Sequence, residues 1–138
     1  FKIMAVNGVG KAIYNILSND SSITDLVGTR IFPQKIEYNS TIPAITYFIT
    51  STTPTNTKNG VSSYDYTDVQ ITAFGSTYDQ ASNLARLIRT ALDYVSGTYA
   101  GIVVDKIFFE DANDIYDDNF GEKGIHYVAM DFQFNIKR

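Results

Sequence analysis

Acidic side chains gather between two predicted strands in the last third of the chain, and they are the strongest candidates for binding a metal ion. The segment from Asp111 to Glu122 has the length of an EF-hand calcium loop, and Asn113 fits its third position. Ile115, however, stands where a fifth-position oxygen ligand is needed, and Tyr116 stands where glycine makes the sharp turn. We therefore exclude an EF-hand and predict a solvated acidic hairpin loop, with a weak, irregular Ca²⁺ or Mg²⁺ site or an electronegative surface as the alternatives.

The residues needed for catalysis are missing. His126 is the only histidine, and with neither a nucleophile nor an orienting acid identified beside it, we predict a packed strand residue. The absence of cysteine excludes disulfides, thiolate zinc sites and cysteine nucleophiles. No serine lies in a GxSxG elbow, and Gly8-Val9-Gly10-Lys11 lacks the spacing of a phosphate-binding loop. We expect no catalytic, cofactor-binding or metal-binding residue, no cofactor, and hence no enzyme.

Charge and length limit the remaining function classes. The net charge is −4, and the 11 Lys and Arg residues are scattered, whereas a protein that binds nucleic acid specifically needs a basic patch. No apolar run reaches the roughly 18 residues of a membrane span, and no signal peptide is visible at the start. The 138 residues predict a single domain. Met4 is the expected native start, and residues 1–6 are expected to be disordered or foreign to the domain.

Hydrophobic periodicity predicts helices and strands in alternation. In the first third of the chain, we predict a helix that opens at Asn7 or Gly8 and ends near residues 18–20, a short helical turn capped at Ser22 and ended by Gly28, and an extended piece over residues 30–33. Two strands over residues 44–53 and 64–74 follow, joined by a polar loop over residues 52–63, and then a long helix capped by Ser76 or Thr77 that continues through Val95 to Gly97. The chain closes with a strand over residues 102–110, the acidic loop over residues 110–122, and a strand over residues 126–136.

The last strand determines the predicted fold. Its apolar residues alternate with polar ones, as in an antiparallel sheet with one covered face. We predict an α+β, two-layer sandwich: a mainly antiparallel sheet of about four strands, with one long and one shorter helix packed on one face. Sheet edges and long polar loops are the surfaces left for assembly. The predicted interface residues are Thr55, Asn56, Lys58, Asn59, Tyr64, Tyr66, Asp114, Asp117 and Asp118.

Three segments resemble a known family. They are the opening helix with the following residues 23–33, Pro43-Ala44-Ile45-Thr46-Tyr47, and residues 69–75 leading through the long helix to Ala91-Leu92-Asp93, with residues 131–134 as a closing strand. In this order and spacing, the chain resembles the tail-completion or tail-terminator family of long-tailed bacteriophages, which includes tail-to-head joining proteins. The resemblance runs from about Val9 to Phe134.

The resemblance implies a structural virion protein, assembled in the host cytoplasm. It would form a homohexameric ring at the head-proximal end of the tail, stop growth of the tail tube, and join the tail to the head connector. DNA would pass through the ring without specific binding, and an acidic lumen would repel the phosphates. A head-completion adaptor or a tail-tube subunit is an alternative. So is a small metal- or ligand-binding enzyme domain that uses the Tyr-rich strand and the acidic loop.

Overall fold

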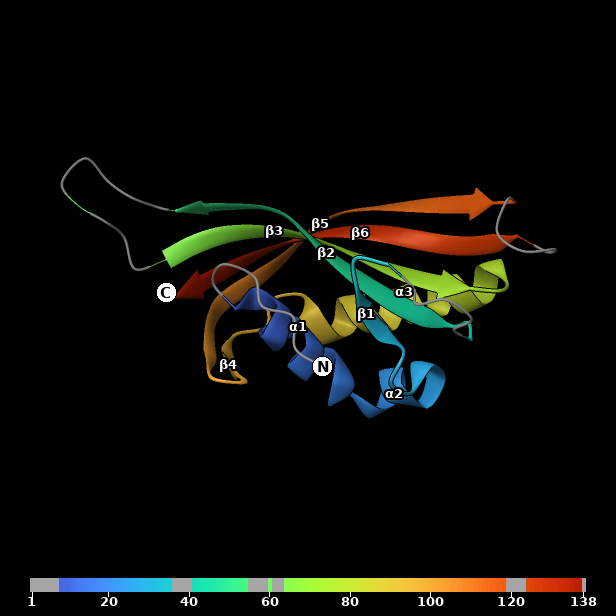
Figure 1. Cartoon of the computed structure of the whole chain (residues 1–138), viewed down its shortest axis with the longest axis horizontal. Helices are drawn as coiled ribbons and strands as arrows, with labels where there is room; N and C mark the ends of the chain where they lie inside the picture. The colour runs from blue at the N-terminus through green and yellow to red at the C-terminus, as the bar shows by residue number, and fades with distance from the viewer. Residues whose placement is uncertain (1–7, 36–40, 55–59, 61–63, 119–123, 138) are drawn as a thin grey trace.

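A computed structural model describes residues 8–35, 41–54, 60, 64–118 and 124–137 (Figure 1). Residues 1–6 and the predicted interface residues Thr55, Asn56, Lys58 and Asn59 lie outside the described residues. Within the described part of the chain, no helix combines the length and the apolar character that a membrane crossing needs.

The first two helices form where the sequence places an apolar stripe behind a suitable cap. Helix α1 (Val9–Ser18) follows Gly8, whose φ of 76° suits glycine, and a Cβ there would stand 2.6 Å from Ile102 Cδ1. Helix α2 (Ser21–Val27) is capped by Asp20, whose carboxylate accepts hydrogen bonds from the backbone N–H groups of Ser22 and Ile23. The cap is therefore Asp20, and the predicted cap at Ser22 is wrong.

Helix α3 (Tyr78–Leu92) is the longest helix and supplies most of the helical side of the core. Thr77 caps it, as predicted, by accepting a hydrogen bond from Gln80 N at 3.1 Å. One stripe of the helix is buried: Ala81, Leu84, Ala85, Ile88 and Leu92. The predicted extension through Val95 to Gly97 is wrong, because Asp93 leaves the helical conformation with ψ at 125°.

Six strands form one curled, mixed sheet in the order β1-β2-β3-β6-β5-β4. Their bounds are β1 (Ile31–Pro33), β2 (Ala44–Pro54), β3 (Tyr64–Gly75), β4 (Gly97–Tyr99), β5 (Ile102–Asp117) and β6 (Ile125–Lys137). The β1–β2 pair is parallel and the other four pairs are antiparallel. Figure 1 shows the three helices along one side of this sheet. We call the other side of the sheet the open face.

The core lies between the helices and the inner side of the sheet. On β6, alternate residues are buried as predicted: Val128, Met130, Phe132, Phe134 and Ile136. Phe132 and Phe134 have no exposed surface, and Val69 and Ile71 of β3 lie beside this row. Helix α3 covers this row, and the apolar stripes of α1 and α3 add Ile13, Leu17, Leu84, Ile88 and Leu92 to the same core. The alternation along β6 therefore decides which side of the sheet the helices cover.

The predicted fold class is wrong in three respects. The structure is a curled half-barrel of six strands with three helices, and not a two-layer sandwich of about four mainly antiparallel strands with two helices. Strand β4 has three residues, too few for alternation to be recognised, whereas β1 lies within the predicted extended piece over residues 30–33. The parallel β1–β2 pair brings Ile31 beside Ile45, a contact that local pattern does not encode.

The predicted acidic loop is a strand as far as Asp117. Asp and Asn are depleted in strands, but residues 111–117 pair in register with residues 131–125 of β6. Pairing with a strong neighbouring strand therefore overrides the weak local propensity. The predicted loop over residues 52–63 also begins too early, because β2 continues to Pro54.

We predict that Asp20→Ala lowers the free energy of unfolding by about 1 kcal/mol, because two backbone N–H groups at the start of α2 lose their acceptor. The matched control is Ser22→Ala on the same helix, where the exposed side chain does not form the cap, and the expected change is within about 0.5 kcal/mol. Urea denaturation followed by circular dichroism measures both. Equal losses in the two variants would contradict the assignment of Asp20 as the cap.

Candidate interaction surface on the open face of the sheet

Two β-bulges at the same level of the sheet create a hollow on the open face. In β2 the pairing with β3 shifts between Ile49 and Ser51, so Thr50 is the extra residue. In β5 the pairing with β6 shifts between Phe109 and Asp111, so Glu110 is the extra residue. Bulges bend a strand and redirect its side chains. Between them lies a hollow of about 380 Å³, lined by Thr50, Asp68, Val69, Glu110, Asp111 and Asp131.

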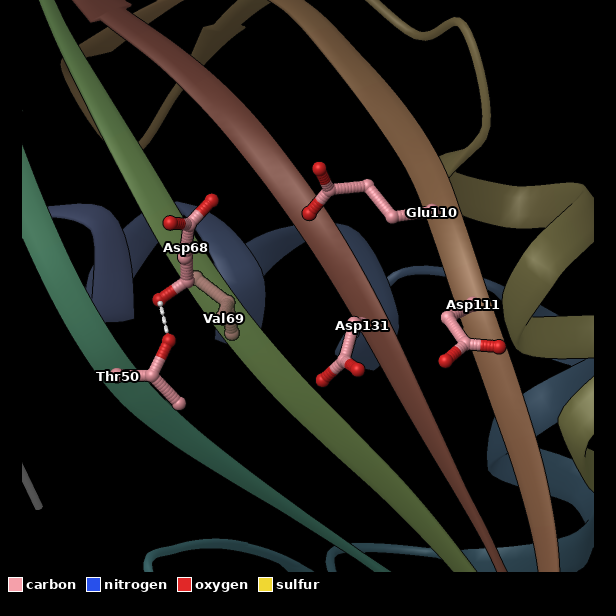
Figure 2. A pocket seen from close by; sticks show the side chains of 6 residues that line it. All are labelled: Thr50, Asp68, Val69, Glu110, Asp111 and Asp131. Carbon is pink, nitrogen blue, oxygen red and sulfur yellow. Dashed lines mark hydrogen bonds between the residues drawn. The ribbon is translucent and has the colours of Figure 1, made fainter.

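Four carboxylates from three strands surround this hollow, and we call them the acidic cluster: Asp68 of β3, Asp131 of β6, and Glu110 and Asp111 of β5. Figure 2 shows them on the near side of the ribbon, with helices behind it. Asp68 is held in place by Ser51, whose hydroxyl donates to its Oδ2 at 2.9 Å. The Thr50 hydroxyl donates to the backbone oxygen of Asp68 at 3.0 Å (Figure 2). The bulges thus concentrate negative charge that is spread over the sequence.

The electrostatic effect is clearest at Glu110. Partial desolvation raises the pKa of its carboxyl above the ordinary value of 4.5, and the negative charges of Asp68 and Asp131 raise this pKa further. A raised carboxyl pKa means that neighbouring groups oppose the ionised form. No three His, Asp or Glu side chains of the described residues are grouped so as to hold a metal ion. The acidic cluster is therefore a concentration of negative charge on the open face.

A second, smaller hollow lies at the other end of the same face. It encloses about 200 Å³ and is lined by Tyr64 and Tyr66 of β3, Asp105 of β5 and Asn135 of β6. Asp105 is itself the extra residue of a third bulge, between Val104 and Lys106. The Oδ1 atom of Asn135 is buried and accepts no hydrogen bond from the part of the chain that the structure describes. This hollow is polar and flanked by two half-exposed aromatic rings.

The start of α3, the end of β5 and the start of β6 meet in an aromatic contact. The Tyr78 hydroxyl donates to Asp114 Oδ2 at 3.0 Å. The ring of His126 lies 4.7 Å from that of Tyr116 and 6.3 Å from that of Tyr78, measured between centroids. His126 is partly buried between these rings, in agreement with its prediction as a packed strand residue.

The predicted interface residues that the structure describes lie at opposite ends of the sheet. Tyr64 and Tyr66 line the smaller hollow at one end of the sheet. Asp114, Asp117 and Asp118 lie at the other end, where β5 pairs with the start of β6. Because successive residues of a strand face opposite sides, Asp111 is on the open face, whereas Asp114 is on the helix side and contacts Tyr78. The acidic segment therefore does not present its charge on a single surface.

Sequence reasoning missed the acidic cluster. Asp68 and Asp131 were visible as polar residues of alternating strands, but the strand order that places them near Glu110 was not. The available signal was a run of aspartates at outward positions of consecutive predicted strands, which becomes meaningful only once β3 and β6 are known to be neighbours.

Comparisons with known proteins identify the family. The sequence matches the family described as tail completion protein gp17 over residues 11–136. The chain belongs to this family. The resemblance to tail-completion proteins noted in the sequence is thereby confirmed. This member of the tail completion family is a structural tail protein, and that membership argues against an enzyme.

The fold is shared with solved structures. A chain in a structure described as the virion of a native gene transfer agent (GTA) particle has a TM-score of 0.71 and 14% identity, covering 97% of this chain and 100% of that chain. A second solved structure has a TM-score of 0.58 and 11% identity and covers 94% of each chain. At these identities the similarity concerns the fold. No curated protein matches the sequence.

We predict that Glu110→Gln stabilises this tail completion protein more at neutral pH than at acid pH. A raised carboxyl pKa contributes stability that is fully present below the ordinary value of 4.5 and is lost as the pH rises through the raised pKa. Glutamine avoids this loss of stability because its side chain does not ionise. Because the side chain is exposed, we expect a small difference.

Urea denaturation of the wild type and Glu110→Gln at about pH 3.5 and about pH 7 measures the effect. In an Asp68→Asn/Asp131→Asn background the difference should shrink, because the two repelling charges are gone. A stability difference that is the same at both pH values would contradict the electrostatic assignment.

Proposed function

We propose that this protein forms a homohexameric ring at the head-proximal end of the tail, where it terminates growth of the tail tube and joins the tail to the head connector. The whole chain would act as one domain, assembled in the host cytoplasm, with the tail-tube protein and a head-connector protein as partners. The observation that carries the proposal is the family match over residues 11–136. The virion described for the gene transfer agent structure supports it, because that chain has the same fold.

The acidic cluster supports a role for the open face as the wall of the DNA channel. In a ring whose lumen is formed by this face, Asp68, Asp111 and Asp131 would meet the phosphates of passing DNA. Like charges repel over about 8–10 Å at ordinary salt, so DNA would slide through without binding. Asp114 would not add to this lumen charge, because it faces the helix side and contacts Tyr78.

The position of the protein in the particle tests the proposal and separates it from its alternatives. Particles produced without this protein should contain tails of irregular length that are not joined to heads, as seen by electron microscopy. Labelled protein should appear as one ring at the head end of the tail. Label along the whole tail would indicate a tail-tube subunit, and label on heads that lack tails would indicate a head-completion adaptor.

We predict that Glu110→Lys slows release of DNA from otherwise complete particles, because a cation in the channel wall attracts phosphates. The matched control is Asp25→Lys, an exposed position on α2 at which the charge changes by the same amount on the helix side. Release is followed with a DNA-binding dye after triggered ejection. The control should release DNA like the wild type, and equal slowing in both variants would remove the open face from the channel wall.

A further inference from the structure

Two stretches of sheet edge carry no neighbouring strand among the described residues. On β2, strand β1 pairs with residues 45–47 and the Gln34 N–H reaches the Tyr47 carbonyl, after which Phe48–Pro54 is uncovered. On β5, strand β4 covers residues 102–104, and residues 93–95 cover Ile107 and Phe109 through three hydrogen bonds. On the rest of that edge, residues 110–117, no strand among the described residues pairs on this side. We call these stretches the β2 edge and the β5 edge.

The two edges differ in charge. The β5 edge carries Glu110, Asp111, Asp114 and Asp117, whereas the β2 edge has no charged residue and is rich in hydroxyl side chains. Uncovered strand edges pair with other strands unless something prevents it. In a copy-to-copy β5–β5 pair centred on Asp114, Asp111 would stand opposite Asp117 and Asp114 opposite Asp114. Like charges directly opposite are destabilising, so two β5 edges repel each other.

We propose that the β5 edge of one copy pairs with the β2 edge of the next copy, so that the sheets of neighbouring subunits join into one continuous sheet around the ring. The inference rests on the proposed ring and names its subunit contact. Strand direction fits: β2, β3, β6 and β5 alternate in direction, so β5 meets the β2 of a rotated copy in antiparallel orientation. The contact is heterologous, the type that closes a ring.

The positions of the two edges along the sheet also fit a closed ring. If side chains of paired residues share a face, Ser51 can stand opposite Asn113 of the neighbour. Ser51 is level with Asp68, and Asn113 is level with Thr72, about 13 Å further along β3. Each copy contributes four strands, about 19 Å of sheet width. A shift of about 13 Å along the strands for about 19 Å of sheet width gives a strand tilt of about 35° to the ring axis, within the range found in closed barrels.

The chemistry across this contact already occurs inside the subunit. On the open face, the hydroxyl of Ser51 donates to the carboxylate of Asp68 on the adjacent strand. In the proposed pairing, Thr53 of the β2 edge would stand opposite Asp111 of the β5 edge, which repeats a hydroxyl beside a carboxylate. The β2 edge therefore offers donors where a second β5 edge would offer only repelling charge.

Cysteine cross-linking tests the contact, because the chain has no cysteine of its own. Particles that carry Ser51→Cys/Asn113→Cys are oxidised and separated on a non-reducing gel. Within one chain the two positions lie on strands separated by β3 and β6, too far apart for a disulfide, so every cross-link joins two copies. We expect a ladder of covalent multimers that ends at the full ring.

Three controls make the result specific. Ser51→Cys/Thr98→Cys places the second thiol on the exposed β4 strand and should stay monomeric. Asn113→Cys alone should not form dimers, and efficient dimers would show β5–β5 pairing instead. Electron microscopy of the same particles reports where the protein is. A ring at the tail end with no cross-linked ladder overturns the edge pairing alone, whereas a ladder from protein located elsewhere overturns only the proposed function.

A charge exchange tests the contact without disulfides. Thr53→Asp puts a carboxylate opposite Asp111 at every contact of the ring, and because the penalty repeats we expect assembled rings to fall about tenfold or more. Adding Asp111→Lys should restore them, since the two side chains then attract. Thr53 and Asp111 are exposed, so both variants should keep the fold, which circular dichroism checks. Unchanged assembly in Thr53→Asp, or a loss that Asp111→Lys does not reverse, would refute the pairing.

Discussion

Burial of one side of β6 against the helices is the interaction on which the other features depend. β6 is hydrogen-bonded to β3 on one side and to β5 on the other along most of its length. Its inner residues, Phe132 and Phe134 among them, are buried in the core beneath α3. Removing one such aromatic side chain from a core costs about 3–5 kcal/mol, a large share of the stability of a small domain. Because a strand alternates strictly, this burial also fixes Asp131 on the open face.

The bulges follow from a conflict between this fixed strand and its neighbours. At the level of Phe132, the inner row continues through Val69, Ile49 and Phe109. The residue after Ile49 in β2 and the residue after Phe109 in β5 are inserted as bulges. Each insertion adds one polar residue, Thr50 or Glu110, beside the carboxylates of the open face. Core packing and surface charge are therefore linked: the bulge that lets Phe109 pack on Phe132, at 5.5 Å between ring centroids, also places Glu110 beside Asp68 and Asp131.

The sequence predicts local features well where a long periodic segment exists and poorly where structure depends on partners. The stripe of α3, the cap at Thr77 and the alternation of β6 are visible in the residues alone, because propensity and burial agree there. The acidic strand beyond Glu110 is not, since its residues disfavour strands and only pairing with β6 holds them. The cluster of four carboxylates needs the strand order, which crosses from β3 to β6 and cannot be read from spacing.

The distribution of acids gives different properties to the face and to the edge of the same sheet. On the open face, partial desolvation and the carboxylates of Asp68 and Asp131 oppose ionisation of Glu110 and raise its pKa, a local cost that folding tolerates because the side chain stays in contact with water. Along the β5 edge, Asp114 and Asp117 alternate between the two sides of the sheet, so no single side carries a matching row of charge. These acids lie on one edge strand. They therefore make this edge repel an identical strand from another copy. A neutral, hydroxyl-rich strand such as the β2 edge meets no such repulsion, and this asymmetry between the two edges favours a contact that has a direction.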